Sequence, residues 1–155
     1  MKVIFLDIDG VLNCSKSKPD CLGYTGIDNE KIKRLKHIVN ETGANIILIS
    51  SWKELWYKES HKKHLQDELA NYLDKKFKRE QLTVLDCTTD INDSRGKGIL
   101  QALSKYSIEN FIIIDDEEFD YKKLKLLPHL IKTKYSCGGL TEELTQHAIE
   151  KLNKG

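Results

Sequence analysis

The feature of this sequence that most constrains its fold is the alternation of short apolar runs with longer segments of helical periodicity. Three of the runs are VIFL, NIILI and FIII, at residues 3–6, 45–49 and 111–114. Their length and their β-branched and aromatic content indicate buried strands. Strands that alternate with helices form a parallel sheet covered by helices on both faces. The sequence therefore predicts an α/β fold, a three-layer sandwich around a central parallel sheet.

Capping residues place the helices between these strands. Asp28 is expected to N-cap a helix that ends at Gly43, and Thr141 to N-cap the last helix. Apolar spacing predicts another helix over residues 96–106, with Ile99, Leu100 and Leu103 on one face. Weaker signals predict a charged helix and two short strands, at residues 54–77, 82–85 and 130–133.

Composition limits the class of protein. A chain of 155 residues suits one domain, residues 1–155, and the net charge of +1 does not indicate a nucleic-acid or membrane surface. The four-residue apolar run near the N-terminus is too short for a signal peptide or a membrane span. We expect a cytoplasmic protein with no membrane contact and no obligatory protein partner. The four cysteines form no close CxxC pair, so reduced thiols are favoured over a zinc site.

Polar side chains follow the predicted strands where each one ends. Asp7 and Asp9 follow the first strand, Ser50 the second, and Asp115 with Asp116 the third. In open parallel sheets, ligands bind beyond the carboxyl ends of the strands. Carboxylates this close together repel, so one would retain a proton unless a cation shared them. The oxygen donors favour a hard cation such as Mg²⁺, to which Asp116 would add a ligand.

The stretch FLDIDGVLN, which contains Asp7 and Asp9, resembles the DxDG signature of the haloacid dehalogenase-like (HAD) hydrolases. The other signatures of that superfamily follow in order: a hydroxyl at Ser50, a lysine opening a helix at Lys97, and the acids of DDEEFD at residues 115–120. The motifs SSWK and CGGLTEEL resemble those of small HAD domains associated with RNA-repair proteins. This resemblance covers nearly the whole chain and implies a Rossmann-like, HAD-like fold.

The resemblance also implies an activity, that of a Mg²⁺-dependent phosphatase of the HAD phosphohydrolase type. Asp7 would attack phosphorus to form an aspartyl-phosphate, and Asp9 would act as general acid and then as general base. Ser50 would donate a hydrogen bond to the phosphoryl group, and Lys97 would bring a positive charge to it.

The same resemblance suggests the metal ligands. Asp7, the backbone carbonyl of Asp9, and Asp116 would hold Mg²⁺. Family members carry either a GDxxxD motif or a DD pair after the third strand, and this chain satisfies both patterns. Alignment of the strand ends favours Asp116, with Asp115 and Asp120 as supporting or substitute ligands.

Gly10, Ser51 and Lys53 are the expected substrate-binding residues. Lys53 stands where the resemblance leads us to expect an arginine, which leaves bidentate phosphate binding there open. The chain between Asp9 and Ser50 is too short for a large cap, and residues 53–95 form either a reduced cap or a scaffold insertion. An open site would accept a phosphorylated small molecule, or the phosphate end of a nucleic acid or a protein.

Other interpretations stay open at this level. A non-catalytic module that binds Mg²⁺ or phosphate has the same acids, and a phosphotransferase would use the same nucleophile. Dehalogenase chemistry has no use for Asp9. Trp52 and its aromatic neighbours either stack on a base or, as is more usual for aromatic side chains, pack in the core or at its rim.

Overall fold

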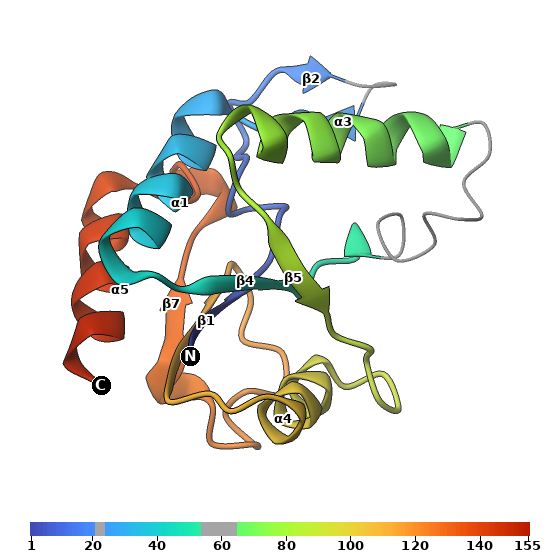
Figure 1. The fold of residues 1–155 in the computed structure, drawn as a ribbon. Helices are drawn as coiled ribbons and strands as arrows, with labels where there is room; N and C mark the ends of the chain where they lie inside the picture. Colours follow the sequence, from blue (N-terminus) through green and yellow to red (C-terminus); the bar gives the residue numbers. More distant parts are fainter. Residues whose placement is uncertain (21–23, 54–64) are drawn as a thin grey trace.

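The computed structural model describes residues 1–20, 24–53 and 65–155 of the chain (Figure 1). Within these residues, a five-stranded sheet has the order β5-β4-β1-β6-β7, and every neighbouring pair is parallel. The strands are β1 Lys2–Leu6, β4 Asn45–Leu48, β5 Val84–Cys87, β6 Asn110–Asp115 and β7 Leu130–Lys132. The predicted α/β fold with a central parallel sheet is confirmed.

The central strand β1 sets the position of the functional residues. Leu6 pairs in register with Leu48 of β4 and with Ile114 of β6, so these three strands end at the same edge of the sheet. The chain moves outward from β1 through β4 to β5, then crosses back to β6 on the other side of β1. The place beyond the carboxyl ends of β1 and β6, which we call the crevice, is therefore the switch point at which open α/β sheets bind ligands.

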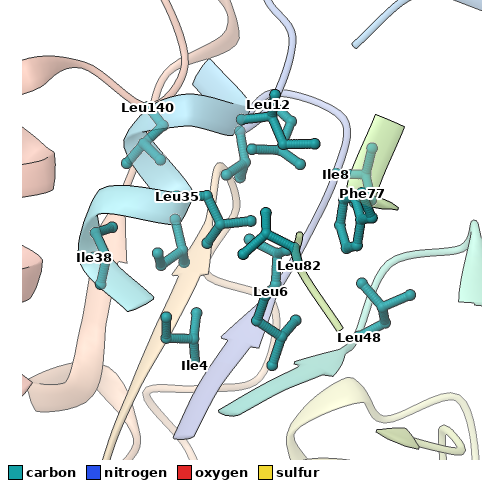
Figure 2. Packing of buried hydrophobic residues seen from close by; sticks show 14 of the residues in the cluster. Ile4, Leu6, Ile8, Leu12, Leu35, Ile38, Leu48, Phe77, Leu82 and Leu140 are labelled. Carbon is teal, nitrogen blue, oxygen red and sulfur yellow. The ribbon is translucent and has the colours of Figure 1, made fainter. Parts of the chain in front are cut away.

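Helices cover both faces of the sheet. The helices α1 Asn29–Thr42, α3 Leu65–Arg79 and α5 Glu142–Lys154 contribute to one apolar layer, and α4 Arg95–Lys105 contributes to the other (Figure 1). In the first layer, Ile4 and Leu6 of β1 belong to the same core cluster as Leu35 and Ile38 of α1 (Figure 2). The resulting order of helix, sheet and helix is the three-layer, Rossmann-like sandwich that the sequence predicts.

Two predicted helix boundaries, at Gly43 and Thr141, correspond closely to the structure. The charged helix expected over residues 54–77 is described as Leu65–Arg79, and the strand expected at 82–85 is Val84–Cys87. Gly43 ends α1 in the left-handed conformation (φ 69°), and the Thr141 side chain caps α5 by accepting from the Leu144 N–H. Asp28 occupies the N-cap position of α1, but its carboxylate accepts from Ser17 and Lys31 instead of capping the helix. Leu100 of α4 was expected on the buried face and is 38% exposed.

Several short elements complete the described part of the chain. They are the antiparallel pair β2 Pro19–Asp20 and β3 Tyr24–Thr25, which follows β1, and the 3-10 turns η2 Leu127–His129 and η3 Tyr135–Cys137. Of the segment 53–95, α3 and β5 belong to the sandwich, whereas residues 54–64 lie outside the described residues. Among the residues described, no helix combines the length and apolar character needed to cross a membrane.

Candidate functional site

Three aspartates meet in the crevice between β1 and β6. Asp7 follows β1, Asp115 ends β6 and Asp116 follows it; one carboxylate oxygen from each lies within 4.8 Å of the other two. The Asp7 N–H donates to the Ile114 carbonyl at 2.9 Å, which joins the two strand ends. The structure thus brings Asp7 and Asp116 together, as the strand-end pattern led us to expect.

Burial and mutual repulsion make this cluster electrostatically costly. Asp7 is only 6% exposed, and burial together with the nearby Asp115 raises its pKa to about 8, although the Arg95 charge opposes the shift. Burial and Asp115 also raise the pKa of Asp116. Each extra negative charge in such a place favours proton retention unless a cation compensates it.

Asp115 is the member of the cluster whose carboxylate is most fully engaged. It is completely buried and accepts hydrogen bonds from Arg95 Nη1 at 3.0 Å, Tyr121 OH at 2.7 Å and the Glu117 N–H at 3.0 Å. These bonds use both of its oxygens, so Asp115 holds neighbouring residues in place and is less available to a ligand. Asp7 and Asp116 are the two acids better placed to receive a ligand.

Arg95 supplies the positive charge beside Asp7. It is the first residue of α4, and its Nη1 lies 3.6 Å from Asp7 Oδ1 as well as 3.0 Å from Asp115 Oδ2. Lys97, the predicted cation, is exposed, and its charge acts on Asp120. The physical reason is helical geometry, since residues two positions apart point about 200° apart around the axis. The sequence reasoning missed Arg95 although it lies in the same stretch, RGKGIL.

Asp120 holds the start of α4 in place. Its carboxylate accepts from the Gly96 N–H at 3.0 Å and from the Ser94 hydroxyl. Burial would raise the pKa of Asp120, but these hydrogen bonds outweigh burial and lower it. Asp120 therefore does not belong to the carboxylate cluster, and its role is to fix the helix that carries Arg95.

Asp9 points into a different environment from Asp7. Its side chain is exposed and accepts from Trp52 Nε1 at 3.0 Å and from Asn13 Nδ2 at 2.9 Å. Both donors are themselves buried, and the Trp52 ring packs against Tyr72 of α3 with centroids 6.4 Å apart. The side chain of Asp9 is thus held outside the carboxylate cluster. The sequence left Trp52 either to stack on a base or to pack in the core or at its rim. It did not single out Asn13, because contacts within and between loops leave no periodic signal.

Gly10 is required for the carboxylate cluster to form. It has a φ of +80°, and a β-carbon at this position would lie 2.8 Å from Asp116 Cβ, closer than real β-carbons approach. The Gly10 carbonyl accepts from the Thr133 hydroxyl at 2.6 Å, and its N–H donates to Asn13 Oδ1 at 2.8 Å. Direct substrate contact by Gly10 remains a prediction.

The residues after β4 divide into buried and exposed groups. Ser50 is 1% exposed, and its Oγ accepts from the Trp52 N–H at 3.2 Å, which leaves the hydroxyl hydrogen available for donation. Ser51 is exposed. Lys53 is buried and pairs with Asp90 Oδ1 at 2.6 Å, so its charge is already neutralised in this structure.

Acids that follow β1 and β6 at the switch point of a parallel, Rossmann-like sheet define a domain of the HAD type. Residues 3–144 match the family model described as the HAD domain in Swiss Army Knife RNA repair proteins, and the chain belongs to this family. Searches of curated proteins and of solved structures found no match.

The donor set in the crevice fits a hard divalent cation. Asp7 and Asp116 offer carboxylate oxygens, the ligands that Mg²⁺ prefers, and the raised pKa of each acid reflects a charge that a cation would compensate. HAD domains typically use such a metal ion. The ligand oxygens belong to strand ends that are fixed by sheet hydrogen bonds, so this part of the site is preorganised.

Proposed function

We propose that this protein is a Mg²⁺-dependent phosphatase that hydrolyses phosphomonoesters through an aspartyl-phosphate on Asp7. The observation that carries the proposal is the convergence of Asp7, Asp116 and Arg95 in one buried crevice, with Asp9 held separately two residues from the nucleophile. Membership of a HAD family supports phosphoryl-transfer chemistry.

In the first step, a carboxylate oxygen of Asp7 forms a bond to phosphorus while the bond from phosphorus to the ester oxygen breaks. Asp9 gives its proton to the departing oxygen, so the product leaves as an alcohol. Arg95 and the Ser50 hydroxyl offset the charge that develops on the phosphoryl oxygens. The buried Nε of Arg95 lacks a hydrogen-bond partner within the described ranges, so this guanidinium has unused donor capacity.

In the second step, a water molecule gives a proton to Asp9 and attacks phosphorus. The bond between phosphorus and Asp7 breaks, inorganic phosphate leaves and the Asp7 carboxylate is restored. Asp7 and Asp116 would hold Mg²⁺ during both steps, with the Asp9 carbonyl as a further ligand. The ion supplies positive charge that keeps Asp7 ionised and balances the charge of the phosphoryl group.

The phosphate end of a nucleic acid is the substrate class that the family description favours, since it refers to RNA repair proteins. A phosphorylated small molecule and a phosphorylated protein end are the competing substrates. Transfer of the phosphoryl group to an alcohol instead of water is the competing fate of the same intermediate. A location in the cytoplasm is part of this proposal.

Hydrolysis of 4-nitrophenyl phosphate tests the proposal. We expect turnover with Mg²⁺, loss of turnover after chelation with EDTA, and recovery when excess Mg²⁺ is added back. Full activity in EDTA would remove the metal from the mechanism. Binding of Mg²⁺ without hydrolysis of any phosphate ester would favour the non-catalytic module.

Replacing Trp52 with phenylalanine should impair hydrolysis according to the leaving group. The change keeps an aromatic ring but removes the N–H that holds Asp9, so kcat/KM for an alkyl phosphate should fall about tenfold or more. 4-Nitrophenyl phosphate should lose much less, because its leaving group departs without a proton. The matched control is Tyr72→Phe, which removes the hydroxyl that accepts from the Ile27 N–H but leaves the Asp9 contact intact. Equal losses on both esters would mean that Trp52 does not act through Asp9.

Removing the metal should make the stability of the protein fall with rising pH. Asp7, with its pKa of about 8 in the folded metal-free state against 3.8 ordinarily, binds a proton that the unfolded chain has lost. Its contribution is full below pH 4 and is lost as the pH rises to about 8. Mg²⁺ replaces that proton, so the gain in Tm on adding Mg²⁺ should be several degrees larger at pH 8 than at pH 6. Thermal unfolding measures this difference, and a larger gain at pH 6 would contradict it.

A further inference from the structure

A hollow of about 370 Å³ lies between the start of α4 and the segment after β6, and Arg95 is part of its lining. Nη1 of the same Arg95 lies 3.6 Å from Asp7 Oδ1. Arg95 therefore belongs both to the lining of this hollow and to the surroundings of the proposed nucleophile.

Phe119 forms one wall of the hollow and is 50% exposed. The Arg95 guanidinium lies over its ring, with Cζ 4.1 Å from the centroid, and Tyr121 packs against it edge-on at 6.0 Å. The φ of Phe119 is +41°, a conformation that bulky residues rarely adopt. An exposed aromatic residue with such a backbone conformation, close to a site, is a reason to look for a ligand there.

The charges around the hollow complement a polyanion. The exposed side chains of Lys97 and Lys123 line it together with Arg95. The lining also contains two acids, Asp93 and Asp120. The carboxylate of Asp120 already accepts hydrogen bonds from Ser94 and Gly96 at the start of α4. Exposed cations around an aromatic face are typical of sites that bind single-stranded nucleic acid, in which a base stacks and a phosphate pairs.

We propose that this hollow receives the nucleotide next to the terminal phosphate of a nucleic-acid strand. Phe119 stacks on its base, and Lys97 and Lys123 pair with the following phosphate. The proposal rests on the proposed function and specifies its substrate. It also gives Lys97 a role in substrate selection instead of the role beside the nucleophile that the sequence suggested.

The alternative interpretation is that Phe119 only shields Arg95 from water. The two interpretations predict different effects of a Phe119 substitution on substrates with and without a base. A shield affects every phosphate ester equally, because all of them use Arg95. A stacking platform affects only substrates that carry a base.

Comparing Phe119→Leu with the unmodified protein on two substrates separates these readings. Leucine keeps an apolar cover for Arg95 but offers no ring. We expect the loss of kcat/KM on short oligonucleotides with a terminal phosphate to exceed the loss on 4-nitrophenyl phosphate by about tenfold. Phe119→Tyr, which keeps the ring, should restore the preference for the oligonucleotide. Equal losses on both substrates, or a selective loss on a phosphopeptide, would overturn the proposal.

Alanine substitutions test the roles of Lys97 and Lys123, with Lys122 as the control. Lys97→Ala and Lys123→Ala should each weaken oligonucleotide binding and reduce its dependence on salt. Lys122→Ala, an exposed lysine outside the lining, should leave both unchanged. Fluorescence anisotropy with a labelled oligonucleotide measures this, and an equal effect of all three variants would argue against the site.

The binding experiment also separates the proposal from the proposed function. If the protein hydrolysed no phosphate ester, the phosphatase assignment would fail, yet oligonucleotide binding that Phe119→Leu weakens would still support the hollow. Hydrolysis of 4-nitrophenyl phosphate together with oligonucleotide binding that is insensitive to Phe119 and both lysines would retain the phosphatase and reject the hollow.

Discussion

Asp7→Asn should lower kcat for 4-nitrophenyl phosphate by about 10⁴-fold or more, because the amide cannot form the covalent intermediate. The loss should appear at saturating Mg²⁺ and substrate, so it cannot be explained by weaker binding of either. Steady-state kinetics with the Mg²⁺-loaded protein measures it.

The stability of the Asp7→Asn variant distinguishes lost chemistry from lost folding. Asp7 is buried beside two other acids, so replacing it removes repulsion from the crevice. The Tm of the metal-free variant at pH 8 should therefore be no lower than that of the unmodified protein. Asp74→Asn changes an acid of α3 that pairs with Lys78, and it should leave activity unchanged. Retention of near-normal activity by Asp7→Asn would end the account.

Arg95→Lys should lower kcat/KM for the same ester by about 10²-fold, within the range seen when a preorganised group that stabilises the transition state is lost. Lysine keeps the charge but presents a single ammonium, which cannot reproduce the planar contacts with Asp7 and Asp115. Lysine is the informative substitution because alanine would leave Asp115 buried without a counter-charge and endanger folding.

Two comparisons control the Arg95 experiment. Arg79→Lys makes the same chemical change at an exposed site on α3 and should have no effect. Lys97→Ala should lower kcat/KM for 4-nitrophenyl phosphate less than Arg95→Lys does. The reverse order would return the role beside the nucleophile to Lys97, as the sequence motif suggested.

The sequence predicted the parts of this molecule that periodicity and strand order control. Parallel strands in one sheet share an edge at their carboxyl ends. Asp7 and Asp116 were therefore expected to meet, although 109 positions separate residue 7 from residue 116. The fold follows from the same logic, since buried runs that alternate with amphipathic helices have few other ways to bury their apolar surface. The HAD signatures then added an interpretation of the acids.

The rest depends on side-chain directions that no motif records. Helix α4 begins at Arg95, one residue before the predicted start. The rotation of this helix about its axis decides whether residue 95 or residue 97 faces the crevice. The contacts of Asp9 with Trp52 and Asn13 involve the loops after β1 and β4, and the hairpin of β2 and β3 consists of very short strands. Such features arise from tertiary packing, which local propensity does not encode.

Covalent trapping of the intermediate tests the central claim most directly. Acid quenching during turnover, followed by borohydride reduction, converts an aspartyl-phosphate to homoserine, and peptide mass spectrometry locates the changed residue. Homoserine at position 7, dependent on Mg²⁺ and absent from Asp7→Asn, is the predicted result. Homoserine at position 115 or 116, or at no position while hydrolysis proceeds, would contradict the account.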